Sequence, residues 1–158
     1  MICNYDFQRL KCQSFLILIF CVAMILPQEM KSQDLFAKIP SPGTNYVTVA
    51  KAASNGKQYV GVWGAGIFTT VNSGADWTEN NSGLTNFYIN AIEFGRTNEL
   101  YVGTIGGIFK STDNGATWNP ANNGLEHLHV KAIKTVANGN VFVGTYGGGV
   151  YVSKDYGA

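Results

Sequence analysis

A repeated turn motif holds the acidic side chains whose spacing is most regular in the sequence. Its clearest copy, residues 111–118, reads Ser-Thr-Asp-Asn-Gly-Ala-Thr-Trp, residues 70–77 form a degenerate copy, and residues 153–158 begin a third. Repeated carboxylates such as Asp113 and Asp155 suggest general acid–base chemistry. A short carboxylate in a turn, however, also accepts backbone N–H bonds, a glycine supplies a strained φ, and a tryptophan packs between sheets. We therefore predict a structural role for Thr70, Asn72, Gly74, Trp77, Ser111, Asp113, Gly115, Trp118, Ser153, Asp155 and Gly157.

A second set of chemically useful residues is aromatic, acidic or imidazole-bearing and falls in predicted loops. Such side chains stack on sugar faces or on peptide side chains, and they add hydrogen bonds. The alternative interpretation is that the aromatic residues pack between adjacent structural units. The candidate ligand-binding residues are Trp63, Phe87, Tyr88, Glu126, His127, His129 and Tyr146.

Other catalytic or metal chemistry is not indicated by the sequence. His127 and His129 alternate on a loop-to-strand segment, but two histidines without a nearby third ligand make a poor metal site. No serine or cysteine has a candidate base beside it. The glycine runs 106–107 and 147–149 precede predicted strands rather than helices, so they indicate turns and not phosphate loops. We predict no catalytic residue, no metal and no cofactor.

An internal repeat positions these residues. Residues 59–61 (Tyr-Val-Gly) recur at 101–103 and, as Phe-Val-Gly, at 142–144, which gives offsets of 41 or 42 residues. A spacing near 40 is typical of a four-stranded propeller blade. The Asn-Gly pairs at 55–56 and 138–139 are strong signals for hairpin turns.

The repeat predicts an all-β fold, a partial β-propeller of about three four-stranded blades. In the second unit we expect strands at 88–94, 100–104 and 108–111, and a fourth that Trp118 opens. A solenoid of β-arches is the competing architecture. The expected blades are 44–82, 83–123 and an incomplete 124–158.

The turn motif resembles the Asp-box, S/T-x-D-x-G-x-T-W, of BNR repeats in sialidase-like, xyloglucanase-like and photosystem II assembly factor-like propellers. The resemblance covers roughly residues 44–158. It implies a fragment of a six- to eight-bladed ring, with the remaining blades in the same or another chain and the motif away from the ligand face. The units are also similar to periplasmic sensor propellers, which bind oligosaccharides.

Two hydrolase hypotheses follow from this resemblance. A sialidase-type site needs an arginine triad, whereas Arg96 is the only arginine after residue 9 and is expected in a turn on the wrong face. A xyloglucanase-like site needs two carboxylates flanking the scissile bond. Glu126 is the only acid we place on the ligand face, and Glu93 on an innermost strand is within reach of the channel.

We therefore predict an exported, non-catalytic binding or scaffold segment that recognises a glycan or a protein. The alternative is part of a xyloglucanase-like glycoside hydrolase whose catalytic acids lie partly beyond residue 158. A purely structural blade array is the third hypothesis.

The N-terminus predicts export. Arg9 and Lys11 precede twelve apolar residues at 15–26, and a polar stretch follows at 28–33. Twelve residues span only ~18 Å as a helix, short of a ~30 Å bilayer core, which is typical of a signal peptide. We expect a signal peptide at 1–33, a linker at 34–43, and the propeller from 44 onward. An uncleaved anchor is the alternative.

Composition supports this placement. All three cysteines lie in the first 21 residues, so the body of the chain has no disulfide or thiolate metal site. A formal net charge of +1 does not indicate binding to nucleic acid or to an anionic membrane surface. We expect a bacterial protein that is secreted, periplasmic or at the cell surface, with no membrane span after signal cleavage.

Overall fold

The computed structural model describes residues 46–157, which form eleven β-strands and no helix. The predicted signal peptide (1–33) and linker (34–43) lie outside the described residues. The first sheet contains β1 (Val47–Ala52), β2 (Gln58–Val62), β3 (Gly66–Thr70) and β4 (Thr78–Glu79). The second contains β5 (Ile89–Phe94), β6 (Leu100–Thr104), β7 (Gly107–Ser111) and β8 (Asn119–Pro120). The third contains β9 (Val130–Thr135), β10 (Val141–Thr145) and β11 (Gly149–Ser153).

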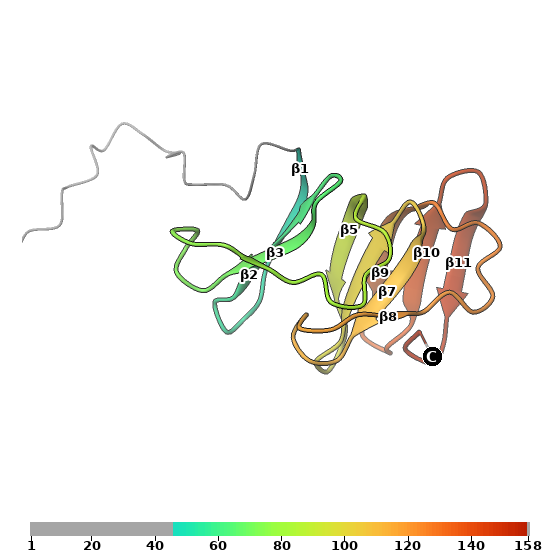
Figure 1. Cartoon of the computed structure of the whole chain (residues 1–158). Helices are drawn as coiled ribbons and strands as arrows, with labels where there is room; N and C mark the ends of the chain where they lie inside the picture. The colour runs from blue at the N-terminus through green and yellow to red at the C-terminus, as the bar shows by residue number, and fades with distance from the viewer. Residues whose placement is uncertain (1–45, 158) are drawn as a thin grey trace, which may run out of the picture. The chain divides into compact units, whose positions relative to one another are not determined.

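Each sheet is an antiparallel meander whose strands are paired in chain order (Figure 1). The second and third strands of each sheet pair in the same register, so that equivalent residues of the repeat face each other. Gly61 pairs with Ile67, Gly103 with Ile108, and Gly144 with Val150. The first strand of the second sheet, β5, contacts β1 on one side and β9 on the other. This arrangement confirms the predicted all-β class and the four-stranded unit, of which the described part of the third sheet has three strands.

Apolar side chains from neighbouring sheets meet in two clusters, which form the core. Alternation along the strands places one set of β-branched and aromatic residues against the preceding sheet and another set against the following sheet. The first cluster contains Tyr59, Ile67, Leu84, Ile89, Ile92, Leu100, Val102, Phe109 and Trp118. The second contains Ala91, Tyr101, Ile108, Val130, Ile133, Val141 and Val143, with Ala121, Leu125 and Tyr151 packed against it.

The motif turn at 111–118 is closed by its own side chains. Ser111 Oγ donates to Asp113 Oδ1 over 2.8 Å and accepts from Gly115 N, also over 2.8 Å. Thr117 donates to Asp113 through its backbone N (2.9 Å) and its Oγ1 (2.6 Å). The Thr117 hydroxyl, the Thr117 amide and Ser111 together lower the pKa of Asp113 to about 2. Asp113 therefore works as a hydrogen-bond acceptor that fixes the turn.

The degenerate first turn reaches the same geometry with different groups. Asn72 Oδ1 accepts from Thr70 Oγ1 (2.7 Å) and from Asp76 N (3.0 Å), while Asn72 Nδ2 donates to Asp76 Oδ2 over 3.0 Å. Relative to Asp113 and Thr117, the carboxylate has thus moved to the later position, Asp76, and the side-chain donor to the earlier one, Asn72. In both turns two consecutive residues have positive φ, as at Asn114 (58°) and Gly115 (79°), so the strain is not confined to the glycine.

Candidate functional site

The candidate ligand-binding residues lie at one end of the strands, and the motif turns lie at the opposite end. Tyr88 and His129 immediately precede the inner strands β5 and β9, while Trp63 and Tyr146 immediately follow β2 and β10. Because neighbouring strands are antiparallel, the start of one strand and the end of the next lie at the same end of the sheet. The motif turns follow β3, β7 and β11, which run in the direction of the inner strands, and so lie at the other end.

Three of the predicted residues come together where the first and second sheets meet. The rings of Trp63 and Tyr88 pack edge to face, with their centroids 5.1 Å apart at an angle of 65°. Phe87 O accepts hydrogen bonds from Gly64 N and Gly66 N, each over 3.1 Å. All three side chains are exposed, and the sheets are joined here by the contact between the Trp63 and Tyr88 rings and by the backbone carbonyl of Phe87. Both interpretations of these aromatic residues, as contacts between blades and as a ligand surface, therefore fit this geometry.

A second group forms at the third sheet. The rings of His129 and Tyr146 lie 5.3 Å apart, and Tyr146 N donates to His129 O over 2.8 Å. Lys131 Nζ lies 5.9 Å from the Tyr146 ring centroid, at cation–π distance. His129 Nε2 is buried and finds no hydrogen-bond partner within 46–157. His127 lies against Gly148, where an added Cβ would be 2.5 Å from His127 Cδ2.

Glu126 is exposed and belongs to neither group through a hydrogen bond or ion pair in the described part of the chain. Tyr46, which sequence reasoning missed, is the residue of the first sheet that corresponds to Tyr88 and His129. It is highly exposed, and its carbonyl accepts from Trp63 N over 2.8 Å. The repeat register contains the signal for Tyr46, because it stands 42 residues before Tyr88.

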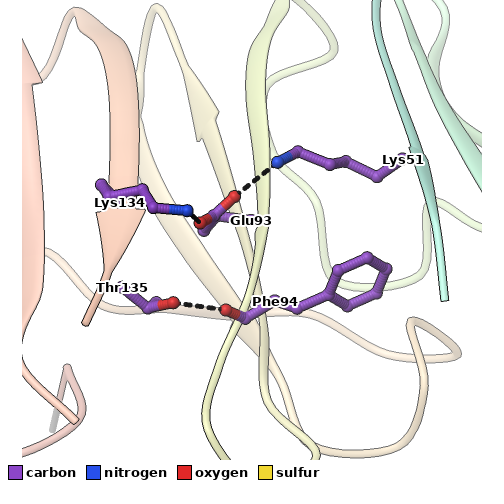
Figure 2. Close-up of polar contacts among 5 residues, drawn as sticks. All are labelled: Lys51, Glu93, Phe94, Lys134 and Thr135. Atoms are coloured by element: carbon purple, nitrogen blue, oxygen red, sulfur yellow. Dashed lines mark hydrogen bonds and ion pairs between the residues drawn. The ribbon is translucent and has the colours of Figure 1, made fainter. Parts of the chain in front are cut away.

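The acid predicted to reach the channel, Glu93, is buried in an ion-pair row across the three inner strands. Lys51 Nζ lies 2.7 Å from Glu93 Oε2, and Lys134 Nζ lies 2.5 Å from Glu93 Oε1 (Figure 2). Beside this row, Thr135 Oγ1 donates to Phe94 O over 2.6 Å, which also joins β9 to β5 (Figure 2).

The surroundings of Glu93 favour its ionised, carboxylate form. Burial by itself raises the pKa of Glu93, but the hydrogen bonds and charges of Lys134 and Lys51 outweigh it and lower that pKa below its ordinary value. A general acid in a glycosidase needs a raised pKa. Glu93 is therefore suited to joining the sheets and not to donating a proton.

Metal-binding clusters are absent from residues 46–157, where no three of the His, Cys, Asp and Glu residues lie close enough together to hold a metal ion. Within that range there is also no helix long and apolar enough to span a bilayer.

Comparison with known proteins places the fold. No family model matches the sequence, and no curated protein is significantly similar to it. Among solved structures, an ancestral GH74 enzyme matches with a TM-score of 0.62 at 19% identity, over 72% of this chain and 17% of that one. YCF48 bound to a D1 peptide matches with a TM-score of 0.62 at 21% identity, over 73% of this chain and 38% of that one.

A third structure is bacterial. The extracellular domain of BT3049, a hybrid two-component system protein from B. thetaiotaomicron, matches with a TM-score of 0.56 at 19% identity, over 70% of this chain and 16% of that one. The chain thus spans well under two thirds of each of these neighbours. Together with the three meandering sheets, these likenesses show that the fold is a partial β-propeller.

Proposed function

We propose that this chain is an exported, non-catalytic binding segment of an Asp-box β-propeller, and that its aromatic rim contacts a glycan. The rim consists of Tyr46, Trp63, Tyr88 and Tyr146. One observation carries the proposal: these four large rings are between 36% and 83% exposed, and they lie at the same end of the strands in three successive sheets. Aromatic faces stack on the C–H faces of sugars, and nearby polar groups add hydrogen bonds.

The variation along the rim supports recognition of a specific ligand. At the position before each inner strand the repeat has Tyr46, Tyr88 and His129 in turn. At the motif turns, in contrast, the hydroxyl, acceptor and glycine recur in the same places. Residues that only hold a blade together repeat with the blade, whereas a surface for an asymmetric ligand differs from blade to blade.

Two of the structural neighbours mark the alternatives. YCF48 was solved with a D1 peptide, so a protein ligand on the same rim is the second candidate. The GH74 neighbours are enzymes, and a hydrolase would need a pair of working carboxylates. Glu93 is ion-paired with Lys51 and Lys134, which argues against it as one of these two carboxylates.

Export is proposed from the leader-like residues 1–33 and from the likeness to an extracellular domain of a bacterial protein. The aromatic rim would then face ligands outside the cytoplasm, where polysaccharides and surface proteins are available.

The proposal is tested by glycan-array binding of the full chain, followed by calorimetry on the best ligand. We expect Trp63→Ala and Tyr146→Ala each to weaken binding about tenfold, because each removes a stacking surface. Val71→Ala is the matched control, since Val71 is an exposed apolar residue in a motif turn at the opposite end. Binding of peptides instead of glycans, with the same dependence on Trp63, would assign the rim to a protein. Ligand binding that neither rim variant changes would refute the proposed site.

A further inference from the structure

Three turns enclose a pocket where the first and second sheets meet, at the end of the strands that holds the motif turns. Residues 53–57 link β1 to β2, residues 95–99 link β5 to β6, and the motif turn after β7 contains Asn114. The pocket has a volume of about 360 Å³, which is within the range of ligand sites. We call it the turn pocket. Its lining is mostly polar and includes Asn55, Arg96, Asn98, Glu99 and Asn114.

The walls of the turn pocket are tied together across the two sheets. Tyr59 Oη and Lys57 Nζ of the first sheet each donate to Asn114 O of the second, both over 3.0 Å. The rings of Tyr59 and Phe94, which also line the pocket, pack edge to face with their centroids 5.8 Å apart. The pocket is therefore bounded by groups whose positions are fixed by contacts between the sheets.

One carboxylate in the pocket is held by its own turn. Glu99 Oε2 accepts from Thr97 N (3.0 Å) and Asn98 N (3.2 Å), and Glu99 Oε1 accepts from Thr97 Oγ1 over 3.3 Å. Burial by itself raises the pKa of Glu99, but the hydrogen bonds of the turn outweigh it and lower that pKa. A carboxylate has about four acceptor sites, so Glu99 Oε1 can also accept from a hydroxyl group of a ligand.

The guanidinium of Arg96 has no such partner in the described part of the chain. Arg96 is exposed and forms no ion pair or side-chain hydrogen bond within residues 46–157, although Glu99 stands three residues further on. A guanidinium pairs with a carboxylate through two parallel hydrogen bonds. Arg96, Lys57 and Glu99 together carry a net positive charge. The pocket thus offers a binding group for a carboxylate from outside the chain.

Three amide side chains add hydrogen-bonding capacity. Asn55 Oδ1 accepts from Lys57 N over 3.0 Å, which leaves its Nδ2 as a donor. The side-chain amides of Asn98 and Asn114 form no hydrogen bond within residues 46–157. Each amide both donates and accepts, as neighbouring hydroxyl groups do. A ligand with several hydroxyl groups would satisfy these amides, whereas a simple amino acid would leave most of them unpaired.

The backbone contact below the turn pocket recurs at the next interface. There Tyr101 Oη of the second sheet donates to Tyr156 O of the third over 2.7 Å, as Tyr59 Oη does to Asn114 O. The counterparts stand 42 residues apart. The role of these residues in joining sheets is therefore independent of the side chain at the position of Asn114 or Tyr156.

The side chains at that next interface close the space instead of lining it with polar groups. Tyr156 takes the position of Asn114, and Gly139 takes that of Asn98. The Tyr156 ring lies on Gly139, because a Cβ added there would be 2.1 Å from Tyr156 Cε1. The counterpart of Arg96 is Ala137. Polar groups at the turn pocket are thus not required for joining two sheets, which indicates a ligand.

We propose that the turn pocket binds an acidic sugar, a pyranose that carries a carboxylate. Arg96 pairs with the carboxylate, while Glu99 Oε1 and the amides of Asn98 and Asn114 bond to the ring hydroxyl groups. The site lies at the opposite end of the strands from the aromatic rim and does not depend on the proposed function.

The test is an NMR titration of the full chain with D-glucuronate, with D-glucose as the uncharged analogue. For a ligand of this size we expect a Kd on the order of 1 mM. Glucose should bind at least about tenfold more weakly, because the charge-assisted bonds to Arg96 are lost. Glucuronate should shift the backbone amides of residues 95–99 and the side-chain amides of Asn98 and Asn114, but not the indole of Trp63.

The role of the guanidinium is tested by substitution. Arg96→Gln should weaken glucuronate binding about tenfold, and because Arg96 is exposed the variant should fold. Arg96→Lys should restore only part of the affinity, since an ammonium group cannot form the two parallel bonds. Lys154→Gln is the matched control, because it removes one positive charge from an exposed position in the third motif turn. It should leave binding unchanged.

The shape of the pocket is tested with residues that the chain already uses. Asn98→Gly combined with Asn114→Tyr copies the next interface, where Tyr156 lies on Gly139. The turn accepts a tyrosine, because Asn114 and Tyr156 have φ angles of 58° and 59°. We expect this double variant to keep its resistance to urea and to lose glucuronate binding.

Several outcomes would overturn the proposal. They are equal binding of glucose and glucuronate, full affinity of Arg96→Gln, and a lack of saturation by glucuronate at about 20 mM. Tighter binding of an amino acid such as L-alanine would assign the pocket to a different class of ligand. Shifts confined to the aromatic rim would place the acidic sugar there instead.

Discussion

The same strand positions are buried in the interface between the first and second sheets, which we call the first interface, and exposed on the outer face of the third sheet. Tyr59 is 1% exposed and Ile67 0% exposed, because the second sheet covers them. Their counterparts on the third sheet, Phe142 and Val150, are 39% and 74% exposed. The apolar character of the positions is kept, so the difference lies in the neighbour and not in the strand.

The glycines of β2 and β10 show the same contrast in steric terms. A Cβ on Gly61 would lie 2.5 Å from Ile89 Cγ2 of the second sheet, and one on Gly103 would lie 2.4 Å from Val130 Cγ1 of the third. A Cβ on Gly144 would have only ordinary contacts, the nearest at 3.7 Å with Ala132 of its own sheet. Each packed interface thus inserts a β-branched residue over a glycine, whereas among residues 46–157 none is inserted over Gly144.

Removal of the buried Trp118 indole from the first interface should have the largest effect on stability. Trp118→Ala removes a fully buried ring and the hydrogen bond to Asn80 O. We expect it to lower the free energy of unfolding by about 3–5 kcal/mol, as for large-to-small changes of aromatic core residues. Urea unfolding of the full chain measures this, with Val71→Ala as the exposed control. A loss below about 1 kcal/mol would show that the first interface does not depend on the indole.

Alanine substitutions at the matched glycines Gly61 and Gly144 should have an effect of intermediate size on stability. Gly61→Ala should destabilise the chain by about 1–3 kcal/mol, because the new methyl group collides with Ile89. Gly144→Ala, the matched change on the outer face, should be close to neutral. Urea unfolding of both variants gives the difference directly. An equal loss in the two variants would mean that the outer face of the third sheet is covered in solution.

The ion-pair row should contribute less than the packing. Glu93→Gln leaves Lys51 and Lys134 without their carboxylate, and we expect a loss of about 1–2 kcal/mol at pH 7. The pKa of Glu93 is lowered in the folded chain, so its contribution is complete above the ordinary carboxyl pKa of ~4.3 and fades as the pH falls through the folded pKa.

Unfolding free energies measured from pH 7 downward therefore test this sign. The difference between the natural chain and Glu93→Gln should shrink below about pH 4. A difference that grows in acid would contradict the lowered pKa.

Much of the fold could be predicted from the sequence because the repeat is visible in local residue types. The predicted strand at 100–104 has the bounds of β6, and Gly56 and Gly139 have the positive φ of 85° and 88° that their Asn-Gly turns require. The positive φ of Ser73 (59°) and Tyr156 (59°) was not predictable from propensity, because the hydrogen bonds of each turn impose it.

The site was less accessible to sequence reasoning. Trp63 and Tyr88 were each predicted as candidate ligand residues, but their edge-to-face contact depends on how two sheets are placed beside each other. The row of Lys51, Glu93 and Lys134 is contained in the 42- and 41-residue offsets, yet its pairing depends on the distance between inner strands. Sequence patterns give positions within a unit well and contacts between units poorly.

The row of Lys51, Glu93 and Lys134 also has an arithmetic consequence. Positive and negative side chains alternate from one sheet to the next at a single strand position. Around a closed circle such an alternation is complete only when the number of sheets is even. An odd number would bring two like charges together at one seam, where they would repel each other.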